Sequence, residues 1–342
     1  MKILLQQRAR LKTGLLKLTC IMLLFFFAGC RKGAENPTVK VSTIATGLAT
    51  PMGIETDRMG NIWIAETGTA HNDGKVIIVK PNGTKYDAIV NLSSIANEQS
   101  GETEGPAHLL LDNGTMYILA GDYMYKANVS SFRPGDKAID ASTLAFEDIG
   151  KFVRTLNIVV PNDSHPYNLA KGPDGDIYIT DAGANAIIHR KSAGNYSILA
   201  KLPDFDNPTP VGPPHIQRVP TGIIFDGHDF LVTTLTGFPF LEGKAVIYKV
   251  SLWGNVSIYQ SGFTTLVSIE DGNIYGHVVL HFGSFGATGF NPNTGSFMLA
   301  NGSSTTVLLG GLNMPVGLKQ INNHSWYITS MGDGTLLKVT YD

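Results

Sequence analysis

The sequence HPYNLAKGPDGDIYITDAGANAIIHR, from His165 to Arg190, contains the pattern that decides the fold. Pro173-Asp174-Gly175 is a turn tripeptide, because proline fixes its own φ and glycine accepts a positive φ. The β-branched and aromatic residues Ile177–Thr180 suit a strand, and a second strand-like run begins at Ala186 after a loop of small residues. The stretch therefore predicts a meander of antiparallel strands joined by tight turns.

The same pattern recurs along the whole chain. The six copies start at five prolines and one threonine: Pro51, Pro106, Pro166, Pro220, Thr265 and Pro315. A four-stranded unit that repeats at about 40–50 residues is typical of a β-propeller. We therefore expect an all-β fold, a single six-bladed β-propeller, over residues 39–342.

The two ends of the repeat region are incomplete in complementary ways. Val39–Ala45 alternates apolar and polar residues before the first full copy, whereas the last copy ends at Val339–Tyr341 without a fourth strand. A strand borrowed from the other terminus would close the ring and leave no open sheet edge. The sequence therefore predicts that the N-terminal strand Val39–Ala45 joins the last blade.

Two copies depart from the pattern. The second contains a long insertion between residues 126 and 161, in which the apolar residues of Ala141–Val153 have a roughly helical spacing. We expect a short surface helix there. Another long loop, Ser93–Gly105, carries three glutamates and is interpreted as a solvated acidic turn. In the looser fifth copy, the second strand is expected around Asn273–Tyr275.

Residues 1–29 have the pattern of a lipoprotein signal peptide. Five basic residues precede an apolar segment, Leu18–Ala28, that is short for a membrane span. The segment ends Phe27-Ala28-Gly29-Cys30, which resembles the bacterial lipobox apart from Phe27 in place of an aliphatic residue. We expect lipidation at Cys30, a linker over residues 30–38, and a membrane-anchored protein of the cell envelope, on the outer membrane or facing the periplasm. An uncleaved anchor or ordinary secretion is the alternative.

Composition argues against several classes of function. The chain has 26 basic and 28 acidic residues and no basic stripe, so no nucleic-acid partner is expected. Both cysteines, Cys20 and Cys30, precede the repeats, which excludes a disulfide or a thiol nucleophile from the propeller. His108, His165 and His277 lie near strand boundaries and could meet at one mouth, although a structural role is the simpler interpretation of each.

Several segments resemble the ScyD/ScyE family, whose proteins are named for a scytonemin-biosynthesis cluster. Val219–Ile223 followed by Leu235–Phe240, with its TGFPF loop, is the most specific of them. His165–Asn168, Thr180–Asn185 and Ala65–Gly68 also look like segments of that family. The resemblance implies an NHL-like six-bladed propeller over roughly residues 39–340, and a biochemical activity that is unsettled.

Loops at one mouth of a propeller converge on its central channel. The residues that end or follow the second strand of a blade are therefore candidates for one shared face, with a fifth-blade candidate near His281. The candidate mouth or ligand-binding residues, together with those from the family-like segments, are Glu66, Asp122, His165, Asn168, Asp181, Asn185, Thr236, Phe238, Phe240 and Ser330. The simpler interpretation of the acids is that they cap turns by accepting backbone N–H bonds. The two phenylalanines either pack under their loop or line a ligand mouth.

These features favour a binding module of the cell envelope over an enzyme, with an unknown envelope ligand or protein as its partner and no cofactor. The alternative is a metal-dependent, lactonase-like hydrolase of the gluconolactonase type, in which Ca²⁺ or Zn²⁺ polarises a lactone carbonyl. Glu104-Gly105-Pro106 resembles an element of that family, which makes Glu104 the alternative metal ligand. Tyr167 and Thr221 stand where the family has Asn and Asp ligands, and this departure disfavours the alternative.

Overall fold

The computed structural model describes residues 38–97, 101–272 and 275–341. The chain divides into two units, Met1–Thr38 and Val39–Asp342, and only the second is described below. The predicted signal peptide and Cys30 lie outside the described residues, so lipidation stays a prediction. Within the described ranges, no helix has both the length and the apolar composition that crossing a membrane requires.

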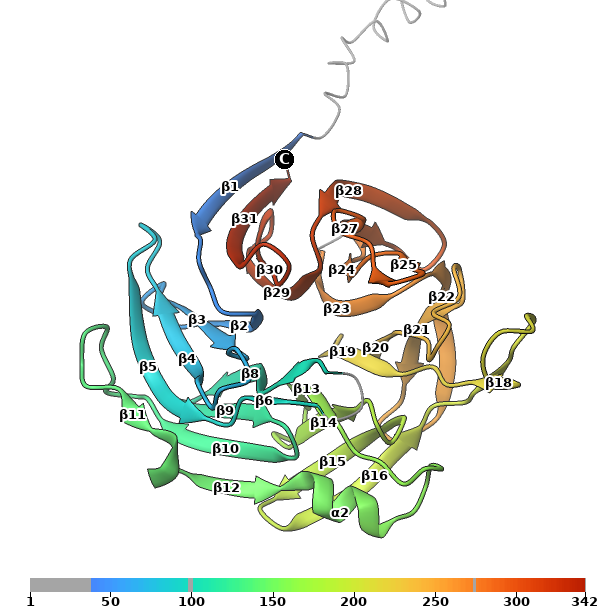
Figure 1. Cartoon of the computed structure of the whole chain (residues 1–342), viewed down its shortest axis with the longest axis horizontal. Coiled ribbons are helices and arrows are strands. Elements are labelled where there is room, and N and C mark those ends of the chain that lie inside the picture. The colour runs from blue at the N-terminus through green and yellow to red at the C-terminus, as the bar shows by residue number, and fades with distance from the viewer. Residues whose placement is uncertain (1–37, 98–100, 273–274, 342) are drawn as a thin grey trace, which may run out of the picture. The chain divides into compact units, whose positions relative to one another are not determined.

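Six antiparallel sheets surround a central axis, and the strands of each blade succeed one another from the axis outward (Figure 1). Blade one consists of β2 (Pro51–Thr56), β3 (Ile62–Glu66), β4 (Gly74–Val79) and β5 (Lys85–Leu92). Blade two consists of β8 (Pro106–Asp112), β9 (Thr115–Ala120), β10 (Tyr123–Asn128) and β12 (Ala145–Asp148). Blade three consists of β13 (Pro166–Lys171), β14 (Ile177–Asp181), β15 (Ala186–Ser192) and β16 (Asn195–Lys201). Blades four and five are β19 (Pro220–Phe225), β20 (Phe230–Thr234), β21 (Ala245–Val250) and β22 (Val256–Phe263); and β23 (Leu266–Asp271), β24 (His277–His281), β27 (Gly295–Ala300) and β28 (Thr305–Leu312). The predicted six-bladed propeller is confirmed.

The sixth blade closes the ring as predicted. Its first three strands are β29 (Pro315–Asn322), β30 (Ser325–Ser330) and β31 (Thr335–Tyr341), and its fourth is β1 (Val39–Ala45). β1 runs antiparallel to β31 with Val39 opposite Tyr341 and Val41 opposite Val339. The N-terminal strand therefore covers the edge that β31 would otherwise expose.

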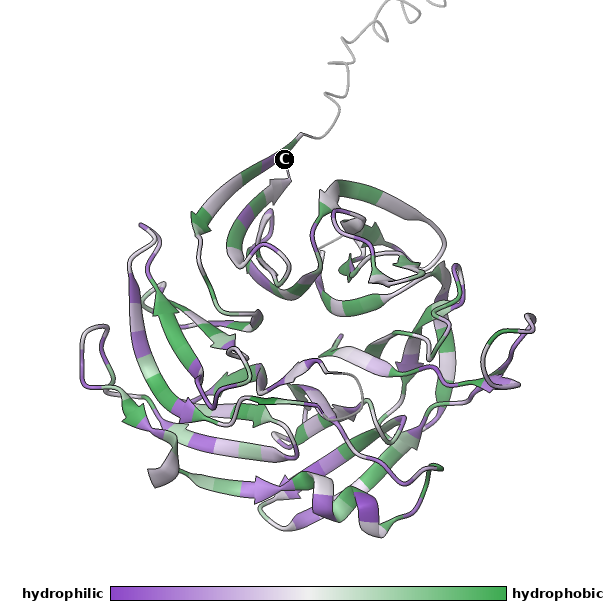
Figure 2. Ribbon diagram, viewed as in Figure 1, coloured by the Kyte–Doolittle hydropathy of each residue, from purple (hydrophilic) through white to green (hydrophobic). Residues whose placement is uncertain are grey.

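Neighbouring blades are joined by apolar packing and by threonine hydroxyls. Trp63 packs against Phe132 between blades one and two, and Trp326 packs against Phe297 between blades six and five. The apolar stretches of the strands are visible as green bands in Figure 2. Thr329 Oγ1 donates to the Met52 carbonyl at 2.6 Å, so the last blade is hydrogen-bonded to the first. Equivalent bonds join blades one and two, and three and four, at 2.9 and 2.7 Å.

The insertion in blade two differs from its prediction. Only its second half is helical, as α2 (Ile149–Thr155), whereas β12 supplies the fourth strand of the blade. The strand forms because Glu147 lies inside the sheet face and makes a buried double hydrogen bond to Arg190 of blade three, at 2.7 and 2.8 Å. A further short strand, β11 (Ile139–Asp140), adds in parallel to β5 as a fifth strand of blade one, and a 3₁₀ turn, Ala141–Thr143, follows it.

The second strand of blade five was also misplaced by the sequence pattern. It is β24, and the turn before it is held by a bond from Gly272 N to Gly276 O at 2.9 Å. Residues 273 and 274 of the expected strand lie outside the described ranges. Three short hairpins complete the domain: β6 (Ile95–Ala96) with β7 (Thr103–Glu104), β17 (Phe205–Asp206) with β18 (His215–Ile216), and β25 (Phe285–Gly286) with β26 (Gly289–Phe290).

Candidate functional site

Several predicted mouth residues use their polar atoms to hold their own loops. The buried Asp181 carboxylate accepts bonds from Ser164 Oγ at 2.6 Å and from the backbone N–H groups of His165 and Ala184 at 2.8 Å. Burial raises the pKa of Asp181 despite these bonds. Glu66 accepts from Ala49 N at 2.9 Å, and burial raises the pKa of this carboxyl too.

The remaining polar candidates differ in how far they are engaged. Ser330 Oγ donates to Asn313 O at 2.6 Å, and Asp122 forms a two-pronged ion pair with Arg154 of α2 at 2.7 and 2.8 Å. Asn185 has a positive φ of 57° and donates to Asp204 at 3.1 Å. Thr236 is buried, and its hydroxyl has no hydrogen-bond partner among the described residues. The turn-capping interpretation fits Glu66, Asp181 and Ser330 best.

The two phenylalanines of the TGFPF loop belong to a larger aromatic group. Phe240 packs against Phe285 and Phe290 with ring centroids 4.6 and 5.2 Å apart, and Phe238 meets Phe285 edge-on at 6.2 Å. The group therefore joins the β20–β21 loop of blade four to the β25–β26 hairpin of blade five. Phe238 is 50% exposed although its neighbours are half-buried, so it is both packed and accessible.

A proline-rich loop lies beside Phe238. Between β17 and β18, Asn207 Nδ2 donates to the carbonyls of Val211 and Pro213 at 2.8 Å, and Asn207 Oδ1 accepts from Thr209 N at 2.9 Å. One side chain thus fixes the loop. A Cβ added at Gly212 would lie 3.2 Å from the Phe238 carbonyl, which shows that the two loops are in contact. We call Val211, Phe238, Phe240, Phe285 and Phe290 the aromatic surface.

A separate site lies on the propeller axis. A cavity of about 290 Å³ is lined by residues of all six inner strands, at positions between the third and the sixth residue of each strand. The cavity therefore lies along the C-terminal half of the inner strands, near the turn that joins each inner strand to the second strand of its blade. The predicted mouth is at the other end, beside the starts of the inner strands. Of the ten predicted mouth residues, only Asn168 lines the cavity.

The deep layer of the cavity lies at the level of the third residue of each inner strand. Three of these residues are polar: His108, Asn168 and Ser268. The other three are Gly53, Gly222 and Gly317. Here glycine is required by close strand approach, since a Cβ on Gly53 would lie 2.7 Å from His108 Cα and one on Gly222 would lie 2.7 Å from Ser268 Cα. Glycines thus bring the polar residues of neighbouring blades close to the axis.

The polar groups of this layer have unused hydrogen-bonding capacity. His108 is 5% exposed, and neither ring nitrogen makes a hydrogen bond among the described residues. Burial lowers the pKa of His108 to about 4, and the nearby Tyr167 backbone offsets this only slightly, so the ring is neutral at pH 7. Asn168 uses its side-chain oxygen for the Leu169 N–H, but its NH₂ group has no described partner. The same holds for the Ser268 hydroxyl, in a side chain only 4% exposed.

The outer layer combines charged and apolar residues. At the fifth position of the inner strands, blades five, six and one supply Glu270, Lys319 and Glu55, with Lys319 Nζ 3.1 Å from Glu55 and 3.9 Å from Glu270. Burial raises the pKa of Glu270 to about 7, although Lys319 opposes this shift. Blades two to four supply Leu110, Ala170 and Ile224. One wall is therefore charged and the other apolar.

The entrance carries a further ion pair. Lys171 Nζ lies 2.7 Å from both carboxylate oxygens of Asp112, and both side chains are about one-third exposed. Sequence reasoning preferred a structural role for His108, with a place at the mouth as the alternative, and it missed Ser268, Glu270 and Lys319. The available signal was the third position of each inner strand, where glycine alternates with a polar residue over much of the ring.

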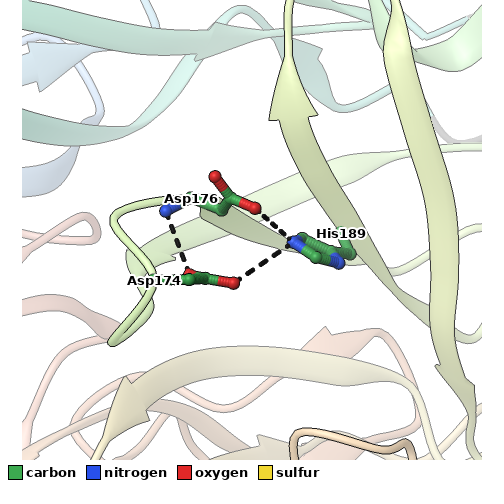
Figure 3. A group of neighbouring side chains, drawn as sticks. All are labelled: Asp174, Asp176 and His189. Carbon is green, nitrogen blue, oxygen red and sulfur yellow. Dashed lines mark hydrogen bonds and ion pairs between the residues drawn. The ribbon is translucent and has the colours of Figure 1, made fainter.

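The predicted alternative metal ligand does not join a group of metal-binding side chains. Glu104 Oε1 accepts from Asn97 Nδ2 at 2.6 Å. Within the described ranges, the group with metal-ligand spacing is Asp174, Asp176 and His189, at the β13–β14 turn (Figure 3). His189 Nε2 lies 2.8 Å from Asp176, and its ring stacks on Tyr178 at 4.4 Å, so these contacts brace the turn against the sheet.

Comparison with known proteins supports the fold. No family model matches the sequence, and no curated protein sequence matches it either. Virginiamycin B lyase from Staphylococcus aureus superposes with a TM-score of 0.52 at 13% identity, over 89% of this chain and 99% of that one. A PQQ-bound aldose sugar dehydrogenase from Streptomyces coelicolor gives 0.56 at 15% identity, over 90% and 99% of the two chains. A gluconolactonase from Xanthomonas campestris gives 0.55 at 9% identity, over 91% and 96%. At such identities the likeness establishes a β-propeller, and the ScyD/ScyE resemblance stays a prediction.

Proposed function

We propose that this protein is a binding module of the cell envelope, anchored by a lipid on Cys30, that presents its aromatic surface to a protein partner. The observation that carries the proposal is the exposure of Phe238 and Val211, at 50% and 51%, on two loops that touch each other. Apolar side chains that gather at one place on a surface, rather than lying singly, are typical of interaction sites.

The order of these loops supports the same proposal. Asn207 fixes the proline-rich loop, and Phe285 packs against both Phe238 and Phe240. Loops ordered in advance lose little conformational entropy when a partner binds, which increases affinity. The aromatic surface consists of one Val and four Phe side chains. A protein partner with apolar side chains fits this composition better than a carbohydrate, which needs hydrogen-bonding groups beside the aromatic ring.

Site-specific photo-crosslinking tests this surface. A photoreactive phenylalanine analogue at position 238 should give a discrete adduct with one envelope protein in intact cells. Phe146 is the matched control, because it is 58% exposed on β12 of blade two, in a different part of the ring. Crosslinking from position 238 alone supports the proposal, whereas no adduct, or the same adducts from both positions, contradicts it.

The anchor has its own test. Cys30→Ser removes the thiol that would be acylated, so the variant should leave the membrane fraction and appear in the soluble fraction of the envelope. Immunoblotting of separated fractions measures this, with the wild-type chain as the reference. A variant that stays fully membrane-bound would show that lipid on Cys30 does not hold the protein.

The hydrolase alternative gains no support from the geometry. Thr221 donates its hydroxyl to Leu266 O at 2.8 Å and is buried in this contact between blades. Hydrolysis of a lactone by the wild-type protein with Ca²⁺ or Zn²⁺, lost in Glu104→Ala, would restore this alternative.

A further inference from the structure

We infer that the axial cavity is a second binding site, which takes a small neutral polyhydroxylated molecule of monosaccharide size. This site is distinct from the aromatic surface and does not depend on its function. Three properties of the cavity carry the inference: its volume, the free hydrogen-bonding groups in its deep layer, and the pairing of its charges.

The volume suits a small molecule. About 290 Å³ is room for roughly ten water molecules at ~30 Å³ each. It is also at the lower limit of ordinary ligand pockets, which begin at about 300 Å³. The glycines at positions 53, 222 and 317 limit the width of the deep layer, because they let the inner strands approach each other closely. A monosaccharide fits such a space, and a peptide side chain or a long chain molecule gains no obvious advantage there.

The unpaired polar groups of the deep layer can be satisfied by a ligand that carries hydroxyl groups. A buried polar group without a partner is costly, so His108, with both nitrogens unpaired, needs a ligand or water to satisfy it. A neutral imidazole offers one donor and one acceptor, and Ser268 offers both as well. Asn168 adds two N–H donors. A group that donates and accepts at once matches each of the three residues, and hydroxyls have this property.

The charges of the outer layer favour a neutral ligand. Three carboxylates share two lysines there: Lys319 lies beside Glu55 and Glu270, and Lys171 lies beside Asp112. Burial raises the pKa of Glu270 to about 7, so this third carboxyl is partly protonated at neutral pH and the layer is close to charge balance. An anionic ligand would add to the two glutamates, and a cationic one would add to the two lysines. A neutral polyol disturbs neither pair. Its C–H face can lie against Leu110, Ala170 and Ile224 while its hydroxyls reach the carboxylate oxygens opposite.

Calorimetric titration of the full-length protein tests the inference. The probes are D-glucose, D-xylose and myo-inositol, with D-glucuronate and D-glucosamine as charged counterparts of similar size. At least one neutral probe should bind, and each charged counterpart should bind more weakly. His108→Leu, which keeps a side chain of similar size, should weaken binding by about tenfold, the equivalent of one lost buried hydrogen bond.

A second variant protects the result from a folding defect. Ser268→Ala removes only a hydroxyl and should also weaken binding several-fold, whereas Ser325→Ala, at a buried serine that does not line the cavity, should leave affinity unchanged. Urea unfolding identifies any variant that does not fold. The inference is overturned if no neutral probe binds, if a charged counterpart binds more tightly, or if folded His108→Leu and Ser268→Ala retain wild-type affinity. The first outcome would assign the cavity to water alone.

Discussion

The two ends of the propeller's inner strands differ in how many of their buried polar groups are hydrogen-bonded, although Thr236 at the mouth has no described partner. Beside the strand starts, Asp181 and Ser330 are buried and their polar atoms are engaged in their own loops. In the cavity toward the other end, His108 is buried and neither of its ring nitrogens has a partner among the described residues, and the hydroxyl of the buried Ser268 makes no described hydrogen bond. Hydrogen-bond saturation, rather than residue type, therefore separates a polar residue that stabilises the fold from one that is available to a ligand.

Asp181→Ala gives the largest effect expected from this contrast. It removes an acceptor from three groups, two of them backbone N–H groups, and leaves them without a partner in a buried site. We expect the free energy of unfolding to fall by about 4 kcal/mol, since each bond to a charged group contributes about 1.5–3 kcal/mol and the losses overlap. Urea unfolding followed by tryptophan fluorescence measures this. A loss below that of the exposed Asp333→Ala control would break the comparison.

His108→Leu tests a buried polar residue whose nitrogens have no described hydrogen-bond partner. The pKa of His108 is lowered to about 4, so between pH 6.5 and 4 the unfolded chain binds a proton that the folded chain rejects. Wild-type stability therefore falls as the pH falls through this window, by about 2 kcal/mol at pH 5. The variant should lack this loss and be at least as stable as wild type at pH 7. Glu270 has a raised pKa and an opposite effect, but it is present in both proteins and cancels in the difference.

Urea unfolding of both proteins at pH 7 and pH 5 gives the measurement. Equal pH dependence in the two proteins would show that His108 is protonated in the fold, and thus that the cavity holds a charge partner for it. A variant less stable than wild type at pH 7 would assign His108 a structural role.

The fold was predictable because local signals and ring closure agree. Each blade begins with a proline or an equivalent residue, and Val39–Ala45 has no partner except the incomplete last copy. The prediction for blade two was wrong because its fourth strand, Ala145–Asp148, is stabilised by a contact between Glu147 and Arg190. These two residues lie 43 residues apart along the chain. A periodicity read over one segment cannot include such a partner.

The site was less predictable for a related reason. Asp and Ser at strand ends read as candidate ligands in the sequence, but only the fold shows that Asp181 and Ser330 are already bonded. His108 and Ser268 sit inside strands, where polar residues read as ordinary alternation. Whether His108 and Ser268 can bind a ligand depends on which groups from other blades face them. It also depends on Gly53 and Gly222, which let those blades approach closely. None of this is local in sequence.

The smallest expected effect gives the most direct comparison, because the same group, a serine hydroxyl, is removed at each of two positions. Ser330→Ala removes a hydroxyl that donates to Asn313 O, which should reduce the free energy of unfolding by about 1 kcal/mol. Ser268→Ala removes a hydroxyl of similar burial that has no described partner, so its effect should be near zero or slightly stabilising. Urea midpoints of the two variants, measured without any sugar present, compare them directly. If Ser268→Ala cost as much as Ser330→Ala, ordered water would already saturate the deep layer. The hydrogen-bonding capacity assigned to a ligand would then have to be regained by displacing that water.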